Sequence, residues 1–317
     1  MKPTSVIFLI LSVILIAAGA VTCFVASQMA SAQEIALFED TEDENGDSHY
    51  YKDFSSSDPS IVTVSVKDAD VHIFGTADSG MSVDLKNFPR SLYELSLANN
   101  NLTVSDSVNL FSVVRKGADG LGFTGLRRFI RGGLFRGGDR KVELAVSESN
   151  TVKQYNISVE NGDIVIEDIG VGADYSLSVK NGSITLKNIS SASGLNADIG
   201  TGDLTVENLN GASDVSVRIA DGDASVTGDF GEDAEAVFEL LKGEAHLTLP
   251  KRDGIRWYLK SGSELSLFGE PLGTSFQNAG EGESIRVTAY GKVVIDEMPA
   301  EVLPAPEGET PAEEPAA

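Results

Sequence analysis

Four ten-residue stretches, each starting 20 residues after the one before, decide the fold of this chain. They read VENGDIVIED from Val159, VKNGSITLKN from Val179, IGTGDLTVEN from Ile199 and IADGDASVTG from Ile219. In each stretch, apolar and polar residues alternate on both sides of an x-Gly pair, which is the period-2 pattern of half-buried strands. Because a repeat of fixed length indicates stacked structural units, the sequence predicts an all-β protein.

Two all-β folds can use this repeat: a parallel β-solenoid with about 20 residues per coil, or an antiparallel β-meander. An Asn-Gly pair between alternating runs is a hairpin signal and supports the meander. In a solenoid, residue i stacks on residue i+20, which places Glu167, Lys187 and Glu207 next to one another on the outside. Their charges alternate in sign along the stack. Like charges one strand spacing apart, about 4.8 Å, would repel, so we favour the solenoid. It also forms apolar columns, namely Val159, Val179, Ile199, Ile219 and Leu240; Ile164, Ile184, Leu204, Ala224 and Ala245; and Ile166, Leu186, Val206, Val226 and Leu247.

The repeat extends in both directions. Its glycines continue at Gly243, Gly262 and Gly282. Upstream, residues 66–73 and 97–104 both align with the first stretch, and Asn100 takes the place of the glycine in the second of them. Asn tolerates a left-handed backbone, so we expect the same corner there.

The alignment predicts one solenoid domain over residues 60–296, flanked by an acidic stalk at 33–59 and a disordered Pro/Glu/Ala tail at 297–317. A solenoid must cover the open strand edges at its two ends. We expect the 33–59 segment and the last strand, residues 292–295, to cover them.

The N-terminus predicts a membrane anchor. Residues 5–26 are 22 residues without a charge, which is long enough to span a bilayer. Lys2 precedes them and acids follow, so the positive-inside rule leaves residues 1–4 in the cytoplasm and the rest of the chain outside. The alternative is a signal peptide cleaved near Ala32, which would release a secreted protein.

Composition excludes several classes of function. The net charge is −24, from 48 acids against 24 bases, which argues against nucleic-acid binding. The only cysteine is Cys23, and the three histidines are scattered, so we expect no disulfide framework, metal centre or cofactor. No motif selects a catalytic pair from the many carboxylates, and we predict that the protein is not an enzyme.

Three segments resemble the bacterial putative-adhesin domain, a family of unknown function in envelope proteins. They are VKDADVHIFG at 66–75, KVELAVSESNTVKQYNISVENGDIVIED at 141–168 and the Asn-Gly and Thr-Gly corners that follow. The resemblance implies a β-solenoid outside a membrane, and it carries no catalytic residues. We therefore expect a non-enzymatic, membrane-anchored adhesin or envelope scaffold. The alternatives are an envelope-stress sensor acting through a partner, and a polysaccharide-acting enzyme.

A basic insertion at 115–141 interrupts the repeat. It reads RKGADGLGFTGLRRFIRGGLFRGGDRK, with eight bases and two acids among glycines and aromatic residues. It is either a loop that covers an edge of the acidic solenoid or a contact for an anionic lipid or cell-wall polymer. For the second hypothesis the candidate residues are Arg127, Arg128, Arg131 and Arg136.

The remaining candidates are weaker. Trp257 and Tyr258 are a possible sugar-stacking platform or fill the wider late coils, and His72 and His246 fall at outward strand positions. An acid row at the corners could bind calcium, but one ligand per coil favours turn chemistry and solubility instead. That row comprises Asp70, Asp163, Asp203, Asp223 and Glu244, interrupted by Ser183.

Overall fold

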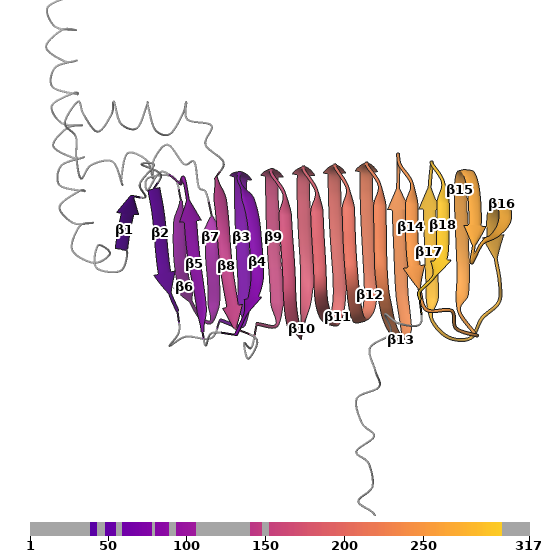
Figure 1. Ribbon diagram of the computed structural model, residues 1–317, viewed down its shortest axis with the longest axis horizontal. Helices are drawn as coiled ribbons and strands as arrows, with labels where there is room; N and C mark the ends of the chain where they lie inside the picture. Colours follow the sequence, from indigo (N-terminus) through magenta and orange to yellow (C-terminus); the bar gives the residue numbers. More distant parts are fainter. Residues whose placement is uncertain are drawn as a thin grey trace, which may run out of the picture.

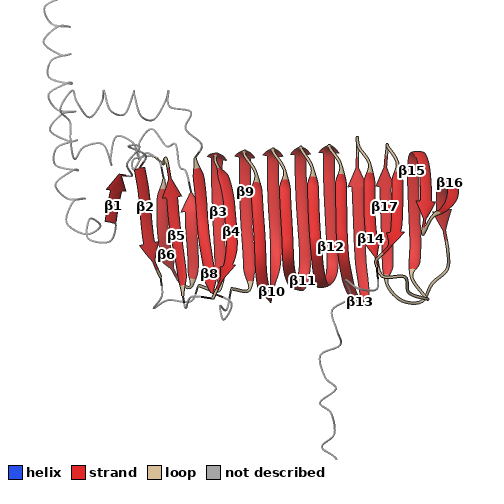
Figure 2. Cartoon of the chain, in the orientation of Figure 1, coloured by secondary structure: helices blue, strands red, loops and turns tan. Residues whose placement is uncertain are grey.

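The computed structural model describes residues 39–42, 48–54, 59–77, 80–88, 93–105, 140–147 and 152–299. Their regular elements are all strands, stacked side by side into an elongated body (Figures 1 and 2). No helix in this part of the chain is long and apolar enough to cross a membrane. The predicted anchor at 5–26 lies outside the described residues.

Four long strands build the centre of the body. They are β10 (Ile164–Asn181), β11 (Ile184–Thr201), β12 (Leu204–Asp221) and β13 (Ala224–Leu240). Each strand starts in one layer, bends, and ends in a second layer. We call the layer that contains their first residues sheet 1 and the layer that contains their last residues sheet 2.

Neighbouring coils pair in parallel with a shift of 20 residues. Ile164 is opposite Ile184, which is opposite Leu204, and Val179 is likewise opposite Ile199. The predicted columns are therefore present and the meander is wrong. Inward aliphatic side chains from both sheets fill the interior, where the rings of Tyr155 and Tyr175 stack 5.4 Å apart.

The bend between the two layers repeats from coil to coil. Asp168, Asn188 and Asn208 occupy it with φ of 59°, 48° and 62°, in the left-handed region that Asn and Asp tolerate. Their side chains hydrogen-bond along the stack, with Asn188 Nδ2 donating to Asp168 Oδ1 over 2.8 Å. The bend therefore holds neighbouring coils in register.

At the N-terminal end, the stacking order departs from the chain order. The strands are β3 (Ile61–Asp68), β4 (Asp70–Thr76), β5 (Met81–Lys86), β6 (Glu94–Ala98), β7 (Asn101–Ser105), β8 (Lys141–Ser147) and β9 (Gln154–Asn161). In sheet 2, β3 lies between β7 and β9, and in sheet 1, β4 lies between β8 and β10. The first coil is thus enclosed by later ones.

The C-terminal end repeats this arrangement. Its strands are β14 (Ala245–Leu249), β15 (Arg256–Leu267), β16 (Glu270–Gln277), β17 (Ser284–Ala289) and β18 (Val293–Glu297). β17 pairs with both β13 and β15, and β18 pairs with both β14 and β15. The last strand was expected to cover an end of the stack, and this is wrong, because β15 and the antiparallel β16 lie beyond it (Figure 1).

The opposite end is formed by part of the predicted stalk. β2 (Ser48–Asp53) pairs antiparallel with β5, and β1 (Glu39–Glu42) pairs with β2. Both strands extend sheet 1 beyond the parallel coils (Figure 1). The antiparallel pairing of both strands and the acids of β1 keep another parallel coil from adding.

Two expected corners are absent. β6 and β7 form an antiparallel hairpin through Asn99 and Asn100, whose φ angles are 52° and 60°. A left-handed pair of this kind makes a hairpin turn, whereas the corner glycine Gly202 has φ of 137°, which Asn does not adopt. The glycine column also does not continue through Gly282, because Gly291 donates its N–H to Gly243.

Candidate interaction surfaces

The corner acids are hydrogen-bond acceptors for the next coil. Asp223 N–H donates to Asp203 Oδ1 over 2.9 Å, and Glu244 N–H donates to Asp223 Oδ1 over 2.7 Å. Ser183 continues the row with its hydroxyl, which accepts from Asp203 N–H. Within the described residues, no group of three or more His, Cys, Asp or Glu could hold a metal ion. The hydrogen bonds that Asp203, Asp223 and Ser183 accept match the interpretation of the row as corner chemistry.

This role predicts a graded response at Asp203. Asp203→Ala leaves the Asp223 N–H without its acceptor and should lower the free energy of unfolding by about 1–2 kcal/mol. Asp203→Ser should lose less, because Ser183 performs the same role one coil earlier. Urea unfolding measures both variants. Equal losses in the two variants would contradict an acceptor role.

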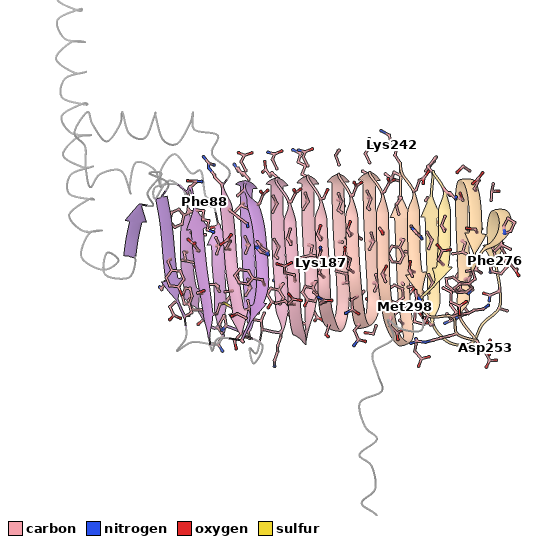
Figure 3. All side chains as sticks on the ribbon, viewed as in Figure 1. Phe88, Lys187, Lys242, Asp253, Phe276 and Met298 are labelled. Carbon is pink, nitrogen blue, oxygen red and sulfur yellow. The ribbon has the colours of Figure 1, made fainter. Side chains whose placement is uncertain are left out.

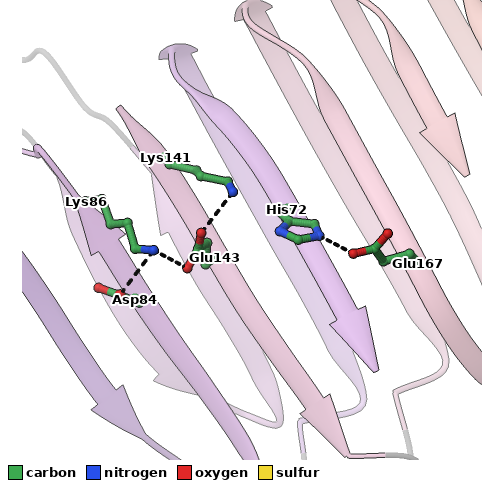
Figure 4. A network of polar contacts seen from close by, with 6 residues as sticks. All are labelled: His72, Asp84, Lys86, Lys141, Glu143 and Glu167. Atoms are coloured by element: carbon green, nitrogen blue, oxygen red, sulfur yellow. Dashed lines mark hydrogen bonds and ion pairs between the residues drawn. The ribbon is translucent and has the colours of Figure 1, made fainter. Parts of the chain in front are cut away.

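The outer face of sheet 1 is a ladder of alternating charges. Lys86 and Lys141 both pair with Glu143, and His72 Nε2 lies 2.8 Å from Glu167 Oε1 (Figure 4). Burial alone would raise the pKa of Glu143, but the hydrogen bonds from the two lysines outweigh it and lower that pKa. Because these charges neutralise one another, the face offers little net charge to a ligand.

The ladder continues along sheet 1 in the direction of the C-terminus. Lys187 Nζ lies 3.5 Å from Glu207, and His246 lies 2.9 Å from Asp296. Lys187 sits midway along the stack in Figure 3. Both histidines are thus surface members of this ladder, which agrees with the outward positions predicted for them.

The outer face of sheet 2 has a different composition. Two rows of outward side chains cross its strands from β7 to β12, and nearly all are uncharged. One row is Thr103, Thr63, Asn156, Ser176, Asn196 and Ser216. The other begins Ser105, Ser65, Ser158 and Ser178, and then reaches the opposite charges Asp198 and Arg218. Ten of these twelve side chains are uncharged, in a chain whose net charge is −24.

Aromatic side chains lie where these rows approach the C-terminal end. Tyr258 points outward from β15, and the Arg286 guanidinium lies over its ring, 5.4 Å from the centroid. Tyr290, at the corner after β17, is 72% exposed, beside Leu241 at 47%. Trp257 is buried at 4% exposure and fills the core, so only Tyr258 of the predicted pair is available to a ligand.

A buried acid sits where the last coil enters the stack. Glu283 is 9% exposed, and its carboxylate lies 3.8 Å from Arg252, which also pairs with Asp229. Burial raises the pKa of Glu283 to about 7; Arg252 opposes this shift and Asp229 adds to it. Sequence reasoning missed this cluster, because the three residues belong to different repeat units.

The raised pKa makes stability depend on pH. The folded state favours protonated Glu283, so its contribution is complete below pH 4.5 and is lost as the pH rises through about 7. At pH 9 the free energy of unfolding of Glu283→Gln should therefore exceed that of the wild type by at most about 3 kcal/mol. At pH 4 the two proteins should have nearly the same free energy of unfolding. Urea unfolding at both pH values tests this, with the exposed Glu281→Gln as control. An equal gain in the control would point to general charge repulsion instead.

Residues 115–139 of the basic insertion lie outside the described residues, whereas Arg140 directly precedes β8 and Lys141 is its first residue. All four candidate arginines, Arg127, Arg128, Arg131 and Arg136, are among residues 115–139. In the sequence the insertion lies between β7 and β8, and both of these strands belong to the N-terminal part of the stack. Its contact with an anionic surface stays a prediction.

Fold and surfaces define the class: a two-sheet parallel β-solenoid with neutral rows on one face. The chain belongs to the family Toastrack DUF4097, whose model matches residues 60–253. This confirms the family resemblance seen in the sequence. The match ends before β15, so the C-terminal end of the stack lies beyond it.

Two solved structures are similar to this chain at a low level. A putative cell adhesion protein from Clostridium sporogenes is 10% identical, with a TM-score of 0.32 over 79% of this chain and 99% of that one. A putative adhesin from Bacteroides fragilis is 8% identical, with a TM-score of 0.36 over 78% and 96%. At such TM-scores neither bears on the function of this chain. No curated protein matches it significantly.

Proposed function

We propose that this protein is a non-enzymatic adhesin or cell-envelope scaffold, anchored in the membrane through residues 5–26 with its solenoid outside the cell. The outer face of sheet 2 is the observation that carries the proposal. It presents outward Ser, Thr and Asn side chains in two continuous rows across neighbouring parallel strands. Such a face suits repeated weak contacts with an extended partner.

Rigidity supports this function. Neighbouring coils are joined by backbone hydrogen bonds, by the corner carboxylates and by the amide ladder at the bend. The first and last coils are each enclosed between others. A body held together in this way keeps its binding face in one conformation. Contacts along the face can then form together, without a loss of conformational entropy at each contact.

Binding to envelope material tests the proposal. Cells displaying the full chain should capture purified cell-wall fragments and should lose the solenoid to added protease while they remain intact. Capture without protease sensitivity would contradict the external location. Protease sensitivity without capture would contradict the adhesin or scaffold function, and would leave the sensor hypothesis to be tested by a membrane pull-down.

We also propose that the basic insertion contacts an anionic lipid or wall polymer. Eight bases in 27 residues contrast with the acidic remainder of the chain, so attraction to an anionic surface is concentrated there. The full chain should bind anionic vesicles at low salt and should release them at high salt. Alanine at Arg127, Arg128, Arg131 and Arg136 should abolish this binding, and binding that survives would contradict the proposal.

A further inference from the structure

We infer that the outer face of sheet 2 binds an uncharged, extended β-1,4-linked polysaccharide whose chain runs along the solenoid axis, across the strands. This inference rests on the proposed adhesin or scaffold function and names its ligand class. The face has two parts. A neutral floor of hydroxyl and amide side chains spans β7, β3, β9, β10 and β11, and an aromatic end lies on β17 and β15.

Charge selects a neutral ligand for this floor. The outward residue Ser176 lies between Asn156 and Asn196, both uncharged, and Ser178 lies between Ser158 and the acid Asp198. Between β7 and β11 an anionic polymer would find no cation in the two rows, and it would meet Asp198 and the repulsion of a chain with net charge −24. A second copy of this chain would carry the same repulsion, whereas a neutral glycan escapes it.

Spacing selects an extended chain. Successive coils present equivalent hydroxyl and amide groups about every 4.8 Å along the axis. The rise per sugar of an extended β-1,4-linked chain is close to this distance. Successive sugars face opposite ways, so every second sugar can make the same contact with every second coil. A curved α-1,4-linked chain leaves the flat face after a few sugars. The repeat therefore favours a β-1,4 linkage over an α-1,4 linkage.

The aromatic end supplies what the floor lacks. Sugar rings stack on aromatic faces through their C–H groups, and Tyr290 offers a largely exposed ring at the corner after β17. Arg286 of β17, held over the ring of Tyr258 on β15, provides donors for sugar hydroxyls. Stacking and hydrogen bonding at this end should hold one end of the glycan while the floor aligns the rest.

The experiment is a pull-down of the full chain in detergent on insoluble chitin, on cellulose and on cross-linked amylose. We expect binding to chitin or cellulose, weaker binding to amylose, and competition by chitohexaose or cellohexaose. Ser176→Lys places a long side chain on the floor and should weaken binding at least about tenfold. The matched control, Thr205→Lys, adds the same side chain to the outer face of sheet 1 and should bind as the wild type does. Tyr290→Ala tests the aromatic end, with an expected loss of about fivefold or more.

Three results would overturn the inference. They are an absence of binding to both β-1,4-linked polymers, equal binding by Ser176→Lys and wild type, and concentration-dependent self-association that Ser176→Lys abolishes. If wall fragments are still captured in any of these cases, the adhesin or scaffold function stands and only the ligand class is wrong. If wall capture also fails, the proposed function fails with it.

Discussion

Replacing Gly202 with alanine is expected to lower the free energy of unfolding by about 4 kcal/mol or more. Its φ of 137° is strained for any residue with a Cβ, and a Cβ there would lie 2.0 Å from the carbonyl oxygen of Gly182. That oxygen belongs to the backbone of the neighbouring coil and cannot move without opening the corner. Strain and steric overlap therefore act together at a position inside the stack.

The matched control lies in the same coil. A Cβ at Gly194 would have only the Asp214 carbonyl oxygen within reach, at 3.6 Å, and its φ lies outside the range that excludes a side chain. Gly194→Ala should change the free energy of unfolding by less than about 0.5 kcal/mol. Urea unfolding of both variants gives the comparison. Similar losses at the two positions would show that the corner geometry is not what requires Gly202.

The interior of the stack could be predicted from the sequence. A 20-residue period, alternating aliphatic residues and outward charges of alternating sign can all be satisfied only by parallel stacking, and Lys187 does pair with Glu207. Each of these signals is local to the four stretches. Their agreement is why the register of β10 to β13 follows from the residues alone.

The order of the coils at the two ends could not be predicted in this way. All coils place similar aliphatic residues inward, so β3 fits beside β9 as well as any neighbour in chain order would. The order depends on which connections reach across the stack, such as the one from β14 to β15. The hydrophobic pattern determines which side of a strand faces the core, but it does not determine which strand pairs with it.

The outer face of sheet 2 could not be fully predicted from the sequence for the same reason. Ser158 and Ser178 could be aligned from the repeat, but Thr63 and Thr103 join their row only because β3 lies between β7 and β9. Tyr258 and Arg286 likewise meet because β17 lies beside β15. A surface assembled across coils that are out of chain order becomes visible only in the structure.

Ending the chain at Gly282 is expected to lower the free energy of unfolding by more than about 5 kcal/mol, because it removes β17 and β18 from inside the stack. A chain ending at Pro299 keeps both strands and serves as the control. The lost strands contribute core side chains that are at most 3% exposed, namely Ile285, Val287, Ala289, Val293 and Ile295. Their removal uncovers Phe238 on one side and Leu259 on the other.

Amide hydrogen exchange distinguishes this arrangement from a stack in chain order. In a chain-order stack, β15 would follow β13 and β14 directly, and its amides would stay protected after the truncation. Here the parallel partners of β15 are β17 and β18, so residues 256–267 should exchange far faster in the shortened chain, whereas β10 to β12 keep their protection. If the protection of β15 is unchanged, β15 can pair with β13 and β14 directly. The enclosed coil of β17 and β18 would then not be required to hold this end of the solenoid together.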